Sequence, residues 1–208
     1  GVALYGGAFR VTRGLAAKFG TDRVLNTPIS ENSFVGVGVG AALCGLRPVV
    51  EIMFMDFIAL AMDQVVNHAA KLHYMYGGQA RVPLVVRAPA GAGRGYGASH
   101  SQSLEAWFVH TPGLKVAAPA TARDAHGLLK AAIRDDNPVI FVENKLLYGV
   151  KGDVPDPGEV IPLGRAAVVR EGGDVTLIAY SRMTSLALEA AAQLEEHGMN
   201  CEVLDLRT

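Results

Sequence analysis

Glu31 is the residue of this sequence best placed to do chemistry. It directly precedes an apolar, glycine-rich run at 34–46, and no lysine or arginine lies near it in the sequence. A carboxylate without a basic partner, in apolar surroundings, suits proton exchange with a neutral ring nitrogen. The alternative is a first-turn glutamate that only complements a helix dipole, and its position alone favours neither interpretation.

The residues around Glu31 predict a helix that begins almost at this carboxylate. Pro28 keeps the residue before it extended, and Ser30 is a suitable N-cap. The run 34–46 is long enough for about three turns. Three alternate positions of the run are glycine: Gly36, Gly38 and Gly40. Each costs roughly 0.8–1 kcal/mol of helix propensity relative to alanine, which predicts the close approach of another backbone.

A second candidate is His100, at the end of a glycine-rich loop at 91–97. The spacing of this loop, G-x-G-x-G-x-G, is neither the dinucleotide fingerprint nor a phosphate loop that ends in Gly-Lys-Ser/Thr. A mobile loop facing a substrate is the better interpretation. Loops at the ends of parallel strands carry the chemistry of such folds, so His100 is the best-placed acid–base histidine, with an ordinary hydrogen-bonded loop histidine as the alternative.

Composition excludes several classes of function. A net charge of −1 offers no broad basic surface for nucleic acid or an anionic membrane, and no apolar run reaches the length of about 20 residues that spans a bilayer. Cys44 and Cys201 are expected to be buried thiols of a reducing compartment. His68 and His73 are five residues apart, which does not place them on one helix face as a metal pair. We therefore expect a protein of the cytoplasm or an organelle matrix, with neither nucleic acid nor membrane as a partner.

The elements that must position these residues alternate along the chain. Strands are expected at 47–54, 83–87, 114–118 and 139–142, and helices at 56–76, 103–110 and 121–134. The last helix starts with Thr-x-x-Asp, a capping box with Asp in the usual Glu position, so Thr121 is its predicted cap. This alternation predicts an α/β fold with a parallel sheet covered by helices on both faces. We place a first domain at 1–145, a proline- and glycine-rich linker at 146–163 and the start of a second α/β domain at 164–208. A single strand–helix–strand unit is expected in that last part, at 174–180, 184–197 and 201–206.

Six segments resemble one family when taken together and in order. They are Phe-Arg-Val-Thr-Arg-Gly-Leu at 9–15, Asn-Thr-Pro-Ile-Ser-Glu at 26–31, Leu-Arg-Pro-Val-Val-Glu at 46–51, His-Ser-Gln-Ser at 100–103, Pro-Gly-Leu-Lys-Val at 112–116 and Ala-Ile-Arg-Asp-Asp-Asn-Pro at 132–138. Over essentially its whole length the chain resembles the β subunit of thiamine-diphosphate-dependent 2-oxo acid dehydrogenases, such as the pyruvate, branched-chain and acetoin dehydrogenases. The resemblance implies a transketolase-type pyrimidine-binding domain followed by the transketolase C-terminal domain.

The same resemblance implies roles for individual residues. The residue matching Glu31 hydrogen-bonds the aminopyrimidine ring of thiamine diphosphate and exchanges a proton with it. Phe57 packs against that ring, and Met53 and Ile29 line the pocket. His100 faces the channel for the substrate and the lipoyl group. A structural potassium ion is implied at Leu84, Ala132, Ile133, Asp135 and Asn137, whose oxygen atoms suit such a cation.

The resemblance also implies partners. The family binds magnesium and the diphosphate through a Gly-Asp-Gly motif that this sequence lacks, as expected if a separate α subunit supplies it in an α2β2 tetramer. A lipoyl acyltransferase component would accept the acyl unit. The sequence also lacks the first strand of the family and most of its C-terminal domain, so we expect an incomplete subunit.

Three interpretations of function remain open from the sequence. The first is an oxidoreductase subunit that acts on a 2-oxo acid, and the segments 53–57 and 144–149 favour its pyruvate or acetoin branch over the branched-chain one. The second is a noncatalytic assembly subunit of the same complex. The third is a nicotinamide-dependent oxidoreductase of Rossmann type, which binding of NAD to the isolated chain would reveal.

Overall fold

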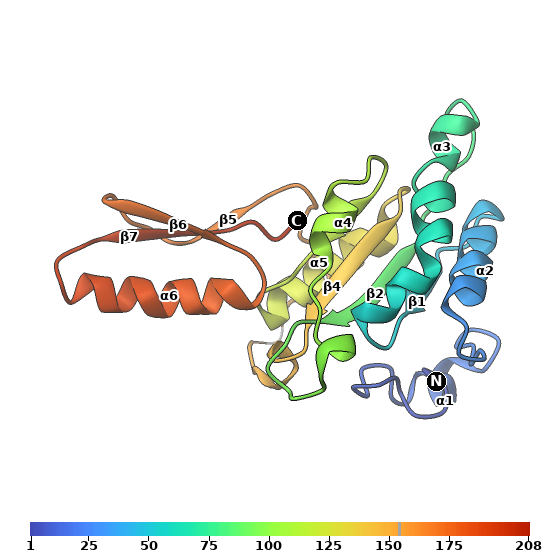
Figure 1. Ribbon diagram of the computed structural model, residues 1–208, viewed down its shortest axis with the longest axis horizontal. Coiled ribbons are helices and arrows are strands. Elements are labelled where there is room, and N and C mark those ends of the chain that lie inside the picture. Colours follow the sequence, from blue (N-terminus) through green and yellow to red (C-terminus); the bar gives the residue numbers. More distant parts are fainter. Residues whose placement is uncertain (154) are drawn as a thin grey trace.

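The chain forms two α/β units, each built on its own sheet (Figure 1). The computed structural model describes residues 1–153 and 155–208. The larger sheet has the order β1-β2-β4-β3, and every pair of neighbouring strands in it is parallel. The smaller sheet has the order β5-β7-β6. The predicted α/β class with a parallel sheet is confirmed.

The larger sheet is centred on two long apolar strands. Its members are β1 (Val49–Glu51), β2 (Val85–Ala90), β3 (Lys115–Ala117) and β4 (Val139–Asn144). All six residues of β2 are buried, and it pairs with β4 from Val85↔Val139 to Ala90↔Asn144. A strand that is buried on both sides needs helices on both faces of its sheet.

Helices cover both faces as expected. On one face, α2 (Glu31–Leu43), the 3₁₀ helix η1 (Met55–Ala61) and the π-helical segment η2 (Asp63–Ala69) pack over the sheet and form the larger hydrophobic core. On the other face, α5 (Ala122–Arg134) packs over a smaller apolar cluster that includes Phe141. The predicted cap of α5 is confirmed, because the Asp124 N–H donates to Thr121 Oγ1 at 3.0 Å.

The long helix predicted at 56–76 is wrong in detail. The chain instead forms η1, η2 and a short α3 (Leu72–Met75) in succession. The tight turns of the 3₁₀ helix are followed by the wider turns of the π-helical segment, and together these segments present one continuous row of buried residues. The row comprises Ile58, Ala61, Val65, Ala69 and Leu72. The row keeps the spacing of three and four residues that a regular helix would give, so the buried face is as predicted and the helix type differs.

Helix α2 begins at Glu31, as predicted. Ser30 occupies the N-cap position without a capping bond, since its hydroxyl donates to Ser33 Oγ at 3.0 Å. The predicted backbone approach to the glycines is wrong, because side chains make the close contacts. A Cβ atom at Gly38 would lie 2.8 Å from Val50 Cγ2, whereas one at Gly40 would meet nothing within 4 Å.

The smaller unit contains one strand more than the sequence predicted. Strands β6 (Val175–Ala179) and β7 (Cys201–Asp205) flank α6 (Arg182–Glu195) in parallel, as expected. β5 (Ala167–Arg170) pairs with β7 in antiparallel orientation. The prediction of a single strand–helix–strand unit is therefore wrong, because this third strand extends the sheet. Three of the four residues of β5 are apolar, but none of the four is buried.

Four further short helices complete the described elements: α1 (Leu15–Phe19), η3 (Ala98–His100), α4 (Glu105–Val109) and η4 (Leu147–Gly149). Cys201 is buried as expected, but Cys44 is exposed, which corrects that prediction. Within the described part of the chain, no helix combines the length and apolar character that crossing a membrane requires.

Candidate functional site

Four of the predicted site residues lie at the carboxyl edge of the larger sheet: Glu31, Met53, Phe57 and His100. η1 follows β1, and the short 3₁₀ helix η3 (Ala98–His100) comes after β2. α2 ends shortly before β1 begins at the amino edge, so Glu31, at the other end of α2, lies at the carboxyl edge (Figure 1). In open parallel sheets this edge is where ligands bind.

Glu31 is a buried carboxylate at this edge. It is only 7% exposed. No hydrogen bond or ion pair connects its side chain to another residue of 1–153 or 155–208. A largely buried carboxylate that has no protein partner among the described residues is available to a polar ligand that enters this edge. This property agrees with the unpaired character of Glu31 in the sequence.

An aromatic cluster lies around His100. The imidazole packs edge-on against Phe54 at 4.8 Å and against Phe57 at 5.1 Å between ring centroids. Phe54 also contacts Tyr96 at 5.8 Å. Ser99 Oγ lies 3.1 Å from His100 Nδ1. The histidine is therefore held in place by ring contacts with Phe54 and Phe57.

Some of the residues expected around the cofactor ring lie close together in the structure, whereas Ile29 is exposed. Phe57 and His100 are in contact, and η1, which carries Phe57, packs against α2, which begins at Glu31. Met53 is half-buried, whereas Ile29 is 76% exposed. The roles of all these residues stay predictions.

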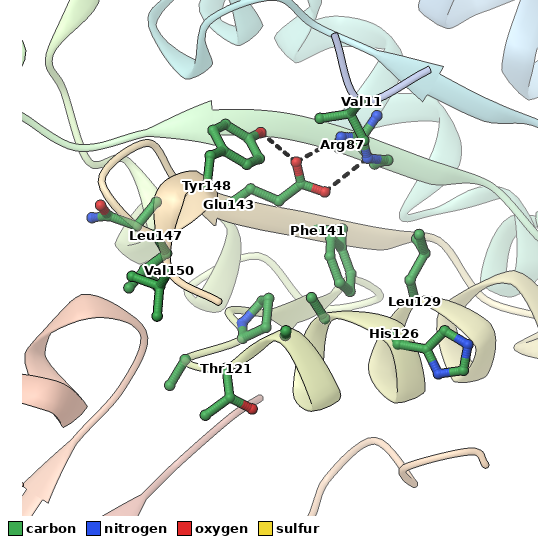
Figure 2. Close-up of a pocket in the computed structure, with 15 residues that line it drawn as sticks. Val11, Arg87, Thr121, His126, Leu129, Phe141, Glu143, Leu147, Tyr148 and Val150 are labelled. Carbon is green, nitrogen blue, oxygen red and sulfur yellow. Dashed lines mark hydrogen bonds and ion pairs between the residues drawn. The ribbon is translucent and has the colours of Figure 1, made fainter. Parts of the chain in front are cut away.

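A buried ion network that the sequence did not single out lies nearby on the strands (Figure 2). Arg87 in β2 donates to Glu51 Oε2 at 2.8 Å and to both Glu143 oxygens at 2.8 and 2.6 Å. Tyr148 adds a short bond of 2.5 Å to Glu143. Arg87 is 4% exposed. The one available signal was an arginine inside an apolar strand, since a buried charge needs partners.

The network shifts the pKa values of its members. Burial alone would lower the pKa of Arg87, but the hydrogen bond and charge of Glu143, together with Glu51, outweigh it and raise that pKa. Burial and the Glu143 charge raise the pKa of Tyr148. Both groups therefore keep their protons throughout the physiological range, and the network is a fixed element of the fold.

A cavity of about 370 Å³ opens beside this network, between β4 and the start of α5 (Figure 2). Its wall includes Arg87, Glu143 and Tyr148, together with Phe141 and His126. Glu31, Phe57 and His100 are not part of its lining. The cavity is thus separate from the predicted cofactor residues.

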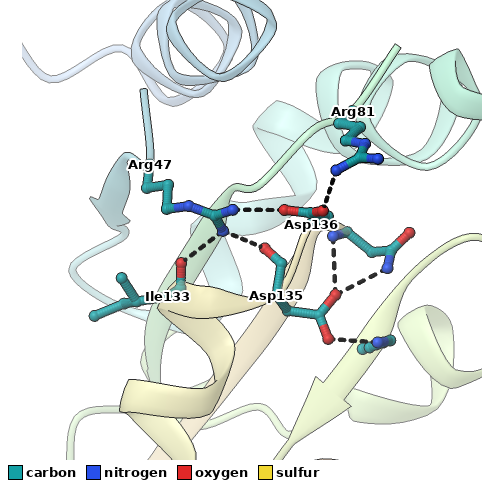
Figure 3. Close-up of polar contacts among 7 residues, drawn as sticks. Arg47, Arg81, Ile133, Asp135 and Asp136 are labelled. Atoms are coloured by element: carbon teal, nitrogen blue, oxygen red, sulfur yellow. Dashed lines mark hydrogen bonds and ion pairs between the residues drawn. The ribbon is translucent and has the colours of Figure 1, made fainter. Parts of the chain in front are cut away.

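The residues of the predicted potassium site lie around Arg47 (Figure 3). Arg47 Nη1 donates to the carbonyl oxygens of Ile133 at 3.0 Å and Asp135 at 2.9 Å. The Leu84 carbonyl accepts from Val139 N–H, and that of Ala132 accepts from Asp135 N–H. In this arrangement a guanidinium occupies two of the oxygens that a cation would use.

Asp135, a member of the same set, is tied to its neighbours through its side chain. Its carboxylate accepts from Lys115 Nζ at 2.5 Å and from Asn137 Nδ2 at 2.8 Å. Burial raises the pKa of Asp135, but these hydrogen bonds outweigh it and hold the pKa below its usual value. Elsewhere in 1–153 and 155–208, no group of three or more His, Cys, Asp or Glu side chains is arranged to hold a metal ion.

Comparison with known proteins assigns both units. The transketolase pyrimidine-binding domain matches residues 1–151, and the transketolase C-terminal domain matches residues 164–208. The chain is 53% identical to the pyruvate dehydrogenase E1 component subunit beta of Rickettsia felis over 100% of its own length and 64% of that protein. It is 52% identical to the acetoin:2,6-dichlorophenolindophenol oxidoreductase subunit beta of Cupriavidus necator, over 98% of its length and 60% of that protein.

A mitochondrial relative shows similar identity. The chain is 52% identical to the pyruvate dehydrogenase E1 component subunit beta-1 of Oryza sativa, over 100% of its length and 56% of that protein. The chain thus spans less than two thirds of the length of these relatives.

Solved structures agree with this assignment. The structure entitled "Split gene transketolase, inactive beta4 tetramer" superposes with a TM-score of 0.75 at 28% identity, covering 94% of this chain and 62% of that one. A transketolase from Pichia stipitis superposes with a TM-score of 0.63 at 20% identity, covering 85% of this chain and 25% of that one. The second similarity concerns the fold alone.

Proposed function

This chain belongs to the transketolase family, and we propose that it is the β subunit of a thiamine-diphosphate-dependent 2-oxo acid dehydrogenase. The observation that carries the proposal is Glu31, a buried carboxylate without a partner among the described residues, at the ligand-binding edge of the sheet. The reaction would be the oxidative decarboxylation of a 2-oxo acid, with a lipoyl disulfide as the acceptor.

The ring end of thiamine diphosphate fits these residues. Glu31 supplies a buried acceptor for a ring N–H, and the half-buried Met53 and Phe57 supply apolar surface for an aromatic ring. When bound, the cofactor supplies a carbon nucleophile for the ketone of the substrate and accepts the electrons released as carbon dioxide leaves. Glu31 would hold the pyrimidine and exchange a proton with it, since no other group among the described residues competes for its carboxylate.

His100 is proposed to act on the substrate side of the same pocket. Its ring rests against Phe54 and Phe57, so it can present a nitrogen to a substrate bound next to the cofactor. Ile29 is 76% exposed in the isolated chain, and a role in the pocket requires that another surface cover it.

Such a covering surface would come from an α subunit, which we propose as the partner in an α2β2 assembly. The described residues offer only the ring end of a cofactor site, so the α subunit would bring magnesium and the diphosphate end. A lipoyl acyltransferase component is the proposed acceptor of the acyl unit. Potassium at Leu84, Ala132, Ile133, Asp135 and Asn137 remains part of the proposal and requires Arg47 to withdraw from two of these carbonyls.

Pyruvate is the proposed substrate, and acetoin is the second candidate. Relatives named for each reach 53% and 52% identity, a difference too small to separate them. A noncatalytic assembly subunit is the remaining alternative. The presence of Glu31, Phe57 and His100 together in this chain argues against it. The relatives come from bacteria and from mitochondria, so we propose the bacterial cytoplasm or an organelle matrix as the compartment.

Reconstitution with an α subunit tests the proposal. Reduction of an artificial electron acceptor is measured with pyruvate, acetoin and branched-chain 2-oxo acids, with and without thiamine diphosphate. We expect cofactor-dependent turnover that is fastest with pyruvate. Fastest turnover with acetoin would favour the second candidate, and cofactor binding without any turnover would indicate an assembly subunit.

A further inference from the structure

Lys145, just beyond the end of β4, touches the glycine-rich loop at three separate points. Its N–H donates to the carbonyl of Ala90, where the loop begins, at 3.1 Å. Its own carbonyl accepts from Arg94 Nη2, in the middle of the loop, at 3.0 Å. Its ammonium donates to the carbonyl of His100, at the end of the loop. A single residue therefore spans the loop from start to end.

The Lys145 ammonium is buried in surroundings where a charge costs free energy unless it makes specific contacts. The residue is 0% exposed, and Nζ lies 5.2 Å from the ring centre of Phe54 and 5.6 Å from that of Tyr96. Burial lowers the pKa of this ammonium, and the charge of Asp56 acts in the opposite direction. Nonpolar side chains of similar volume fill such positions at lower cost, so the ammonium calls for a specific explanation.

Asp56 holds the chain on the other side of His100. Its Oδ1 accepts from Ser101 N–H at 3.2 Å, from Gln102 N–H at 3.1 Å and from Gln102 Nε2 at 2.9 Å. Asp56 is 8% exposed, and its Oδ2 has no hydrogen-bond partner among the described residues. Opposite charges thus bind the backbone at His100 and directly after it.

The loop has little else to fix its shape. Residues 92–99 are all exposed, and four glycines with positive φ alternate along it. Those glycines are Gly91, Gly93, Gly95 and Gly97. A backbone with such freedom loses much entropy when it is ordered, so its position depends on the contacts at its ends.

We propose that Lys145 is a positioning residue that, together with Asp56, holds the glycine-rich loop closed and thereby keeps the His100 ring against Phe54 and Phe57. The loop-holding role follows from the contacts of this chain alone. Its consequence for turnover rests on the proposed function, because it requires His100 to face the substrate.

Lys145→Met tests the proposal, since methionine keeps an unbranched side chain and removes only the ammonium. Lys71→Met is the matched control, because Lys71 Nζ also donates to a carbonyl, that of Pro112 at 2.5 Å, outside this loop. Trypsin cleavage after Arg94, followed by fragment mass, measures loop opening in the full chain. We expect about tenfold faster cleavage after Arg94 in Lys145→Met, from the loss of a charge-assisted hydrogen bond, and no change in Lys71→Met.

Two further measurements distinguish a positioning role of Lys145 from a role in overall stability alone. We expect the melting temperature of Lys145→Met to stay close to that of the wild type, because the loop opens locally and the removal of a buried charge offsets the lost hydrogen bond. In the reconstituted enzyme we expect turnover to fall about tenfold while the Kd for thiamine diphosphate stays unchanged, because Glu31 and Phe57 are not disturbed. Unchanged cleavage after Arg94, or faster cleavage that accompanies general destabilisation, would overturn the proposal. If the wild-type enzyme shows no turnover but cleavage responds as expected, the proposed function fails and the role of Lys145 stands.

Discussion

At the residue scale, the fold contains two kinds of buried charge: charges that are paired with each other and one carboxylate that has no protein partner among the described residues. Arg87 pairs with both Glu51 and Glu143 inside the sheet, where Arg87 is 4% exposed. Glu31 is nearly as buried, at 7%, yet pairs with none of the described residues. The first arrangement stabilises the fold, whereas the second keeps a carboxylate ready for a ligand.

Arg87→Met tests the structural half of this contrast. The substitution leaves the Glu51 and Glu143 carboxylates facing each other without a cation, so we expect the free energy of unfolding to fall by about 3–5 kcal/mol. Urea unfolding followed by circular dichroism measures this loss. Tyr148→Phe is the control, because it removes only the hydrogen bond to Glu143 and should cost about 1.5–3 kcal/mol. A loss in Arg87→Met no larger than in Tyr148→Phe would contradict the role of the arginine.

Single residues were predictable from the sequence where their local neighbours define them. Glu31 could be identified because the residues around it offer no basic partner, and His100 because it ends a glycine-rich loop. The roles of Arg87, Asp56 and Lys145 could not be predicted, because their hydrogen-bond partners lie 36 to 56 residues away in the sequence. Long-range pairing of buried charges leaves no periodic signal in a single sequence.

At the element scale, α2 joins the core to the site. Its first residue, Glu31, lies at the ligand edge, and Gly38, further along, lets the helix approach β1 and β2. A Cβ at Gly38 would come within 2.8 Å of Val50 and 3.2 Å of Leu84. The position of Glu31 thus depends on how closely α2 packs on the sheet.

Gly38→Ala and Gly40→Ala are expected to change stability in opposite directions. Alanine at position 40 meets nothing within 4 Å, so the gain in helix propensity of about 1 kcal/mol should appear as added stability. Alanine at position 38 must displace Val50, and overpacking of this kind costs about 1–3 kcal/mol. Thermal unfolding of the two variants provides the measurement. Equal stabilisation by both would show that α2 does not pack as closely as described.

Elements were predictable where apolar periodicity is regular. The strands of the larger sheet, α5 with its Thr121 cap, and the start of α2 follow from such patterns. In the region 56–76 the periodicity predicted the buried face, but not the 3₁₀ helix and π-helical segment, because both bury the same row of residues as a regular helix. β5 was missed because an exposed strand of four residues has no buried face to reveal it.

At the scale of the whole molecule, two units meet around Arg207. Its carbonyl accepts from Ala118 N–H at 2.8 Å, and its guanidinium pairs with Asp124 of α5 at 2.8 Å. The smaller unit is thereby attached close to the carboxyl edge of β3. The pairing joins residues 83 positions apart, and the sequence alone did not predict it.

The whole molecule also presents only part of a site. We propose that Glu31, Phe57 and His100 hold the ring end of a cofactor, while Ile29 remains 76% exposed. This combination is the reason for proposing a second subunit as the carrier of the other half. The central claim is that Glu31 exchanges the proton on which turnover depends.

Glu31→Gln tests that claim most directly. The variant keeps the size and a hydrogen-bonding oxygen but cannot exchange a proton, and it is combined with an α subunit, thiamine diphosphate and pyruvate. Release of carbon dioxide is measured next to the wild type, with the melting temperature as the control for folding. We predict an unchanged fold and turnover lowered by at least about 100-fold, the usual scale of general acid–base catalysis. Turnover close to that of the wild type would contradict the account.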